Sequence, residues 1–333
     1  MDYKNKIIEE LEIIRKSEII NKNIFKARAY GKVITQLKSF NDKITSFDDV
    51  KQIEGIGKSI EDKIKEIITT GVSSKAEAIK ENSEINISNE LLKIYGVGST
   101  KASQLVKKYS IRSIEQLREL IQKDPNTKIL NDKQKVGLKY LEEIEERIPR
   151  NEMVKHEKYI FDIIKNTTPL FLGNIVGSYR RGLANSGDID ILITYKDISA
   201  KKALEEYNKL IDKLIENGYI TDILAKGSKK CMGVCRLLSS GKDFKHRRID
   251  LLLTTPTEYP YALLYFTGSD KFNIEFRKLT LEAGYSLNEH GLKIVKDGLT
   301  IPKNIETEQD IFDFFKIKYL NPNERSEFKI IVL

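Results

Sequence analysis

The spacing of apolar residues changes near the middle of this chain. In the first half, apolar side chains recur every three or four residues, as in Ile7, Leu11 and Ile14, and residues 25–38 repeat this spacing. Such spacing places the apolar side chains on one face of a helix. Runs of the kind that form strands are short and scattered here. The pattern therefore predicts helices up to about residue 150.

The second half begins with a different pattern. Residues 171–195 and 247–255 carry dense runs of isoleucine, leucine and valine near turn residues, which is typical of strands in a buried sheet that begins near Phe171. Residues 200–216 return to helical spacing, and the sequence Arg-Ile-Pro-Arg at 147–150 marks the boundary between the halves. We expect a multi-domain α+β protein.

Two aspartates stand at the start of one apolar run. Asp188 and Asp190 are two positions apart, so in a strand both side chains point to the same face, about 7 Å apart. Two carboxylates on one face of a buried strand repel each other and are costly to desolvate unless a cation lies between them. Mg2+ prefers such oxygen ligands. The Gly177-Ser178 turn and Arg181 are suited to an anion beside the metal, which predicts a site of phosphoryl or nucleotidyl transfer.

The overall charge favours a polyanionic partner. The 333 residues carry a formal net charge of +8, and the pI is about 9.0. The two cysteines, Cys231 and Cys235, form neither a disulfide framework nor a zinc motif, so we expect core thiols. No apolar run approaches the ~18 residues that span a membrane, and the N-terminus is charged, so we expect an intracellular protein without a signal peptide.

An internal repeat lies in the helical half. Ile-Glu-Gly-Ile-Gly-Lys at 53–58 and Ile-Tyr-Gly-Val-Gly-Ser at 94–99 start 41 positions apart, and each precedes an amphipathic helix. The glycines permit a tight turn, and the N–H groups of the following helix face a phosphate, as in helix-hairpin-helix motifs. Such contacts bind the nucleic-acid backbone without reading its sequence. The alternative is a pair of ordinary glycine turns between core helices.

Several segments together resemble DNA polymerase beta and its relatives, family X of the DNA polymerases, from about residue 20 to about residue 327. They are both hairpin repeats, residues 136–140, 147–150 and 177–190, Arg-Arg-Ile-Asp at 247–250, and Tyr-Phe-Thr-Gly-Ser-Asp at 265–270. The resemblance implies a helical lyase-like domain at 1–83 with the first hairpin and a helical DNA-binding subdomain at 84–148 with the second. A nucleotidyltransferase palm with a mixed sheet at 149–258 and a small α+β C-terminal subdomain at 259–333, which binds the nascent base pair, would follow.

The resemblance also implies roles for the acidic residues. Asp188, Asp190 and Asp250 would be the catalytic carboxylates that hold two Mg2+ ions, for which Mn2+ can substitute, in an in-line displacement. Asp250 lies in a second apolar run and would serve as base or metal relay for the primer 3′-hydroxyl. The alternative is three carboxylates in solvated salt bridges.

Residues that would contact the nucleotide and the template follow from the same resemblance. The triphosphate would be bound by Arg147, Ser178, Arg181 and Gly187. Tyr265 and Phe266 would line the sugar, although without the resemblance they would be interpreted as core aromatics. The remaining set comprises Gly268, Asp270 and Asn273 at the nascent base pair, Arg277 at the template minor groove and Arg248 at the primer terminus. Arg180 is expected to have a structural role.

The N-terminal domain would act as a 5′-deoxyribose phosphate lyase. Lys63 matches the nucleophile that forms a Schiff base, and nearby cations would favour the loss of its proton; the alternative is a solvated lysine that only neutralises DNA charge. The further expected DNA contacts are Lys26, Tyr30, Lys51, Lys58, Lys75 and the hairpin glycines Gly55, Gly57, Gly96 and Gly98, with Asp62 as an auxiliary position and monovalent cations at the hairpins.

Three positions depart from the family pattern. Phe25 replaces a histidine and Ser59 a lysine in the 5′-phosphate pocket, although Lys58 is adjacent and can compensate. Ile274 replaces a lysine near the template base. We expect the first two changes to affect lyase efficiency more than polymerase activity.

The resulting functional prediction is a template-dependent polymerase that fills short gaps in base excision repair. Its partners would be gapped or nicked double-stranded DNA and deoxynucleoside triphosphates, and it would act as a monomer in the nucleus or the cytoplasm without membrane association. One alternative is a template-independent terminal transferase, against which the short segment between Cys235 and Arg247 argues. Another is a non-catalytic DNA-binding protein, against which the three aspartates argue. No BRCT domain, PHP domain or proofreading exonuclease is expected.

Overall fold

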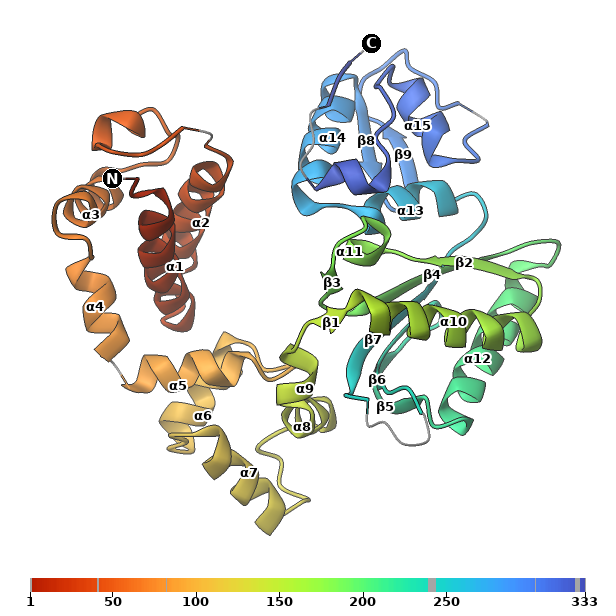
Figure 1. Ribbon diagram of the computed structural model, residues 1–333, viewed down its shortest axis with the longest axis horizontal. Helices are drawn as coiled ribbons and strands as arrows, with labels where there is room; N and C mark the ends of the chain where they lie inside the picture. Colours follow the sequence, from red (N-terminus) through yellow and green to blue (C-terminus); the bar gives the residue numbers. More distant parts are fainter. Residues whose placement is uncertain are drawn as a thin grey trace. The chain divides into compact units, whose positions relative to one another are not determined.

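The computed structural model describes residues 2–40, 42–81, 83–238, 244–302, 304–326 and 330–332. The chain divides into two compact units, Met1–Leu141 and Glu142–Leu333 (Figure 1). The first unit is helical and the second contains the sheets, so the predicted change of pattern near residue 150 is confirmed. Among the described residues, the search for a helix that could cross a membrane finds no candidate.

The first unit contains two hydrophobic clusters. Leu11, Val33 and Ile64 are fully buried in the first cluster, and Leu91 and Leu105 in the second. The helices are α1 (Lys4–Ile20), α2 (Ile24–Ser39), α3 (Lys58–Thr70), α4 (Ser74–Glu81), α5 (Ser83–Leu92), α6 (Ser99–Lys108), α7 (Ile114–Lys123), α8 (Asp132–Lys139) and α9 (Leu141–Glu145), with a 3-10 turn η1 (Phe47–Asp49).

The two predicted hairpins have the same backbone conformation. Gly55 and Gly96 have positive φ angles of 96° and 81°, which a residue with a side chain rarely adopts. Gly57 and Gly98 are extended and precede the first turns of α3 and α6. All four glycines are exposed, which leaves both turns accessible to a ligand. The predicted helix-hairpin-helix repeat is therefore confirmed as a structural feature.

A five-stranded mixed sheet forms the centre of the second unit. Its order is β2-β4-β7-β6-β5; β4 and β7 are parallel, and the other pairs are antiparallel. The strands are β2 (Phe171–Ile175), β4 (Ile189–Tyr195), β5 (Ile220–Lys226), β6 (Lys230–Cys235) and β7 (Arg247–Leu253), and a separate ribbon pairs β1 (Ile148–Pro149) with β3 (Asn185–Ser186).

Helices α10 (Arg150–Thr167) and α12 (Ala200–Glu216) cover one face of this sheet (Figure 1). Ile189, Ile191 and Ile249 point into the core beneath these helices. Because side chains alternate along a strand, Asp190 and Asp250 point to the opposite face. The two cysteines are free and buried, as expected of core thiols.

The C-terminal part packs around aromatic residues. Phe272, Phe276 and Phe312 are almost fully buried in one cluster. Its elements are α13 (Tyr259–Thr267), α14 (Asp270–Glu282), the hairpin β8 (Tyr285–Asn288) and β9 (Gly291–Ile294), α15 (Glu308–Phe314) and a 3-10 turn η2 (Pro322–Arg325). The multi-domain α+β class is thus confirmed, while the finer boundaries at 84, 149 and 259 remain predictions.

Candidate active site

Two of the three predicted carboxylates lie on neighbouring parallel strands. In the pairing of β4 with β7, Asp190 stands directly opposite Asp250. Asp188 immediately precedes β4. The apolar residues on the helix-covered face hold both strands in register, so the carboxylates share the other face. This register brings together residues that are 60 positions apart in the sequence.

Two cations lie beside these carboxylates. Arg248 donates from Nη2 to Asp188 Oδ2 at 2.8 Å, and Lys230 Nζ lies 3.2 Å from Asp250 Oδ2. Within the described ranges, no cationic side chain pairs with Asp190 in this way. Burial, together with the charges of Asp188 and Asp250, raises the pKa of Asp190 to about 7. Burial also raises the pKa of Asp250, and Lys230 opposes that shift.

The donor chemistry of this site fits a divalent cation. Three carboxylates are available, and Asp190 is half-buried with a carboxyl group whose charge is poorly compensated. As the side chains stand, no group of three His, Cys, Asp or Glu residues in the described part of the chain encloses a metal ion. Arg248 and Lys230 hold Asp188 and Asp250, so a metal would have to compete with both contacts.

The turn before α11 (Gly177–Arg180) comes close to the carboxylates. Gly177 has a φ of 61°, and a β-carbon there would lie 3.0 Å from Asp190 Oδ2. Val176 N donates to the carbonyl of Asp190 at 2.8 Å, which fixes the turn against β4. Ser178 is therefore held in the first turn of α11, beside the carboxylate strand, and its anion contact remains a prediction.

The short ribbon positions Arg147 beside Gly187. Arg147 precedes β1, and its guanidinium donates to the Oδ1 and the carbonyl of Asn185 in β3 at 2.7 and 3.0 Å. A β-carbon at Gly187 would lie 3.1 Å from Arg147 Nη1. Two of the residues expected at the triphosphate are thus adjacent, one residue away from Asp188.

Arg181 links α11 to the end of α13. Its Nη1 donates to the carbonyl of Thr267 at 2.6 Å, and its Nε to Ser326 Oγ at 3.3 Å. A β-carbon at Gly268 would lie 3.3 Å from the same Nη1. Burial lowers the pKa of Arg181, whereas the nearby charge of Asp270, at the start of α14, opposes that shift. Arg181, Gly268 and Asp270 are therefore neighbours, although Arg181 is engaged with protein groups.

The aromatic pair lies at the same end of α13. Tyr265 and Phe266 are half-buried and meet edge to face, with ring centroids 5.0 Å apart. Asn273 donates to the carbonyl of Tyr265 at 2.8 Å. Tyr265, Asn273 and Arg277 line one small cavity, so residues expected at the sugar, the nascent base pair and the template share a surface.

Arg180 has the structural surroundings that the sequence suggested. It donates to Thr267 Oγ1 at 2.6 Å and to Glu308 at 2.7 Å. Glu308 also accepts from Arg325 at 2.7 Å, and both of these side chains are buried. Glu308 was not recognisable from a local pattern, because its two cationic partners, Arg180 and Arg325, are 128 and 17 positions away from it.

A second site lies in the first unit. A cavity of about 300 Å3 is lined by Glu18, Lys26, Ala29, Tyr30, Gly55, Gly57, Lys58, Ser59, Ile60 and Lys75. Lys63, one helical turn beyond Ser59, donates from Nζ to the carbonyl and the hydroxyl of that residue at 2.8 and 2.9 Å. Phe25 is 87% exposed near the start of α2.

Three of the lysines expected to assist Lys63 form ion pairs. Lys75 pairs with the buried Glu18, Lys58 with Asp62 at 3.2 Å and Lys51 with Asp48 at 3.1 Å. Each pair weakens the positive field that would assist deprotonation of Lys63. Reasoning from the sequence missed Glu18, because nothing in the pattern of α1 distinguishes this buried carboxylate from the exposed ones.

Models of four protein families match consecutive parts of the chain. They are a helix-hairpin-helix domain over residues 3–73, the fingers domain of DNA polymerase lambda over 89–145, the DNA polymerase beta palm over 147–256 and the DNA polymerase beta thumb over 262–326. These matches cover both hairpins, the carboxylate strands and the aromatic pair.

Curated relatives agree with these models. DNA polymerase lambda of Rattus norvegicus is 32% identical over 97% of this chain and 56% of the relative. DNA polymerase lambda of Arabidopsis thaliana is 32% identical over 90% of this chain and 57% of the relative. The DNA polymerase/3′-5′ exonuclease PolX of Bacillus subtilis is 26% identical over 97% of this chain and 55% of the relative. The chain spans a little over half the length of these relatives. On the joint match of its four consecutive parts, the chain belongs to family X of the DNA polymerases.

Proposed function

We propose that this chain is a template-dependent DNA polymerase that fills short gaps by nucleotidyl transfer. The observation that carries the proposal is the parallel register of β4 and β7, with Asp190 opposite Asp250 and Asp188 one residue before the strand. The named activities of the relatives, which are DNA polymerases, support the same reaction.

Asp188, Asp190 and Asp250 would hold two Mg2+ ions, or Mn2+ in their place. When bound, such ions supply Lewis-acid activation of the primer 3′-hydroxyl and neutralise charge on the triphosphate and the leaving pyrophosphate. Asp250 has a raised pKa and lies beside Lys230, which suits a carboxylate that accepts the proton of the 3′-hydroxyl. Arg248 neighbours Asp188 and would face the primer terminus.

The triphosphate would lie between the Gly177 turn and the β1–β3 ribbon. Ser178 and the N–H of Gly187 would bind its non-bridging oxygens, and Arg147 would supply a positive charge. Arg181 would have to exchange its contact with the carbonyl of Thr267 for the phosphate. Binding of the nucleotide would thus be linked to a movement of α13 relative to α11, which would exclude water from the reacting atoms.

Template dependence is tested with a one-nucleotide gap. The protein is expected to insert the nucleotide complementary to the template in strong preference to the other three, and to extend a single-stranded primer poorly. Equal extension of both substrates would instead favour the terminal transferase. The segment between Cys235 and Arg247, whose shortness argues against that alternative, includes residues 239–243, which lie outside the described part of the chain. Retained DNA binding without any incorporation would favour the non-catalytic alternative.

The first unit would add a lyase step. The amine of Lys63 would attack the aldehyde carbon of a 5′-deoxyribose phosphate, with loss of water to give a Schiff base. Abstraction of a C2′ proton then breaks the C3′–O bond and leaves a 5′-phosphate on the DNA. The cavity beside Ser59, with Lys26, Lys58 and Lys75 in its lining, is the expected phosphate pocket.

Borohydride trapping tests the lyase proposal. Reduction of the Schiff base should produce a covalent protein–DNA adduct that Lys63→Ala abolishes. Lys65→Ala is the matched control, because Lys65 lies on the same helix but pairs with Glu61, whereas Lys63 contacts Ser59 in the cavity lining. Adduct formation that survives Lys63→Ala would assign the nucleophile to another amine.

The cellular role proposed here is base excision repair on gapped or nicked DNA, with the protein acting as a monomer. The exposed hairpin glycines would bind the DNA backbone, with monovalent cations at both turns. Light scattering of the protein with and without gapped DNA tests the monomeric state; a constant dimer mass would contradict it.

A further inference from the structure

A buried arginine stands at the start of the strand that carries Asp250. Arg247 is the first residue of β7 and is 2% exposed. Its side chain points to the helix-covered face of the sheet, whereas Arg248 and Asp250 point to the other face. Arg247 therefore holds the strand from behind, one residue before Arg248 and three before Asp250.

The guanidinium of Arg247 binds two other parts of the chain at once. Nε and Nη2 donate to the two carboxylate oxygens of Glu152, in the first turn of α10, at 2.7 and 2.9 Å. Nη1 donates to the carbonyls of Glu143 and Glu146 at 3.4 and 3.1 Å. These carbonyls belong to residues 142–146, here called the connector, which includes the end of α9.

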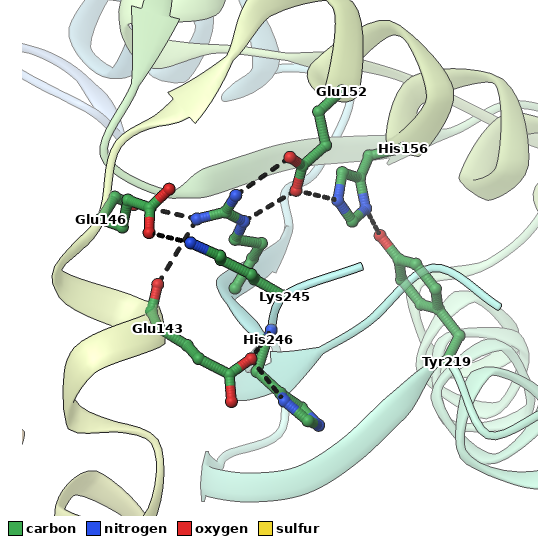
Figure 2. Close-up of polar contacts among 8 residues, drawn as sticks. Glu143, Glu146, Glu152, His156, Tyr219, Lys245 and His246 are labelled. Atoms are coloured by element: carbon green, nitrogen blue, oxygen red, sulfur yellow. Dashed lines mark hydrogen bonds and ion pairs between the residues drawn. The ribbon is translucent and has the colours of Figure 1, made fainter. Parts of the chain in front are cut away.

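A buried histidine lies on the other side of Glu152. His156, one turn further along α10, has Nε2 at 3.7 Å from Glu152, and its Nδ1 lies 2.7 Å from the hydroxyl of Tyr219 (Figure 2). Burial would raise the pKa of Glu152, but His156 and Arg247 outweigh it and bring the pKa to about 2. Burial lowers the pKa of His156 and raises that of Tyr219. Glu152 is thus a fixed anion between a neutral ring and Arg247.

The connector has a second, more exposed set of contacts with the residues just before β7. Glu143 accepts from the backbone N of His246 at 2.5 Å and lies 2.9 Å from its Nδ1 (Figure 2). Lys245 pairs with Glu146. These contacts involve the same segments as Arg247 but are not buried, so they provide a control for its role.

A buried ion pair is a weak source of stability, because well-packed apolar side chains of similar size often stabilise a protein as much. The arrangement around Arg247 is instead directional, since a planar fork binds one carboxylate and two carbonyls in a single geometry. Glu152 lies five residues after Arg147, which is expected to contact the triphosphate. The fork therefore joins this segment to β7, the strand of Asp250, which is expected to accept the proton of the 3′-hydroxyl.

On the basis of the proposed polymerase function, we propose that Arg247 is a positioning residue. By binding Glu152 and the connector, it sets where Arg248 and Asp250 stand relative to Asp190 and Arg147. Some residues orient metal ligands without touching the metal themselves. Their removal typically lowers metal affinity or activity by about 10-fold to 100-fold. Loss of the fork is expected to have an effect of this size on the carboxylate site.

The decisive variant replaces both partners, Arg247→Met with Glu152→Met. It removes the directional contacts without leaving a buried charge alone, so the protein should unfold at a temperature near that of the wild type. Its affinity for Mn2+, measured by electron paramagnetic resonance on the protein without DNA, should fall by about 10-fold to 100-fold. In single-nucleotide gap filling, kcat should fall by a similar factor, while KM for the nucleotide changes less.

Lys245→Met is the matched control, because it removes an exposed ion pair of the same connector and leaves the contacts of Arg247 intact. It should leave Mn2+ affinity and kcat unchanged. If the double variant does not fold, Arg247→Lys decides, since one ammonium group cannot replace the fork. A folded variant of either kind with wild-type Mn2+ affinity would overturn the positioning role alone. If the wild type does not bind Mn2+, or if its Mn2+ binding does not depend on Asp190, the proposed function is contradicted and the positioning role falls with it.

Discussion

Asp190 and Asp250 stand directly opposite each other on parallel neighbouring strands, on the face of the sheet that α10 and α12 leave uncovered. Two carboxylates in this position repel each other, and within the described residues Lys230 forms an ion pair with Asp250 whereas Asp190 has no ion pair. The pair is therefore a source of instability in the absence of metal.

Stability without metal should depend on pH through Asp190. Its pKa is raised in the folded protein from 3.8 to about 7, so the folded state favours the protonated form. The stabilisation is complete below about pH 4 and is lost as the pH rises through 7, by on the order of 4 kcal/mol. Asp190→Asn stays neutral and should be the more stable protein at pH 8 in the presence of a chelator.

The measurement is the difference in melting temperature between wild type and Asp190→Asn from pH 4 to pH 8. The difference should grow in favour of the variant with rising pH, and Mg2+ at pH 8 should stabilise only the wild type. A difference that is independent of pH would contradict the raised pKa.

A side chain at Gly177 should disturb the carboxylate site. In Gly177→Ala the β-carbon would lie 3.0 Å from Asp190 Oδ2, and the positive φ adds strain of roughly 1–2 kcal/mol. Gly71→Ala is the control, because Gly71 has a φ of 83° and no atom within 4 Å of the added carbon. Both variants should lose similar stability in urea unfolding, but only Gly177→Ala should lose Mn2+ affinity. An equal loss of Mn2+ affinity in both variants would show that the contact with Asp190 is unimportant.

Removal of the charge on Glu18 should strengthen phosphate binding in the first unit. Glu18 is buried and pairs with Lys75 in the lining of the cavity, so Glu18→Gln frees this lysine for a phosphate. The ratio of interest is the affinity for gapped DNA with a 5′-phosphate divided by the affinity for gapped DNA with a 5′-hydroxyl. This ratio should be several-fold higher for Glu18→Gln than for the wild type. Fluorescence anisotropy measures this ratio, and Glu77→Gln, which removes one of the two carboxylate partners of Lys80 outside the cavity lining, should leave it unchanged. If Glu18→Gln also leaves this affinity ratio unchanged, the assignment of the cavity as the 5′-phosphate pocket is wrong.

Glu308 should be needed for stability of the C-terminal part. Glu308→Gln leaves the cations of Arg180 and Arg325 without their buried partner, which should cost about 3–5 kcal/mol. Glu306→Gln, two residues earlier and exposed, should change stability by no more than about 0.5 kcal/mol. Urea unfolding compares the two, and equal stabilities would contradict the importance of this network.

Local patterns were sufficient to predict much of the fold. The helical first half, the onset of the sheet near Phe171 and both glycine hairpins depend on short-range periodicity and on turn residues, which are visible in the sequence. Strands β5 and β6 were not predicted, because charged and small residues interrupt their apolar pattern.

The candidate site shows the same division between local and distant relationships. Asp188 and Asp190 were recognisable from their spacing alone, whereas Asp250 came from the family resemblance, since its register with Asp190 is set by tertiary packing. Lys230, Glu152 and Glu18 were missed for a related reason. Each acts through a partner that is distant in the sequence, such as Arg247 for Glu152, 95 positions away, and no local pattern records such a pair.

The most direct test of the central claim is the rate of single-nucleotide insertion on gapped DNA by the wild type and by Asp190→Asn. Asp212→Asn is the control, because Asp212 is an exposed residue of α12 that pairs with Lys226. With Mg2+ present, insertion by the wild type and by Asp212→Asn should be equal, and Asp190→Asn should be slower by at least about 100-fold. Undiminished insertion by Asp190→Asn would contradict the assignment of the carboxylates on β4 and β7 as the catalytic centre.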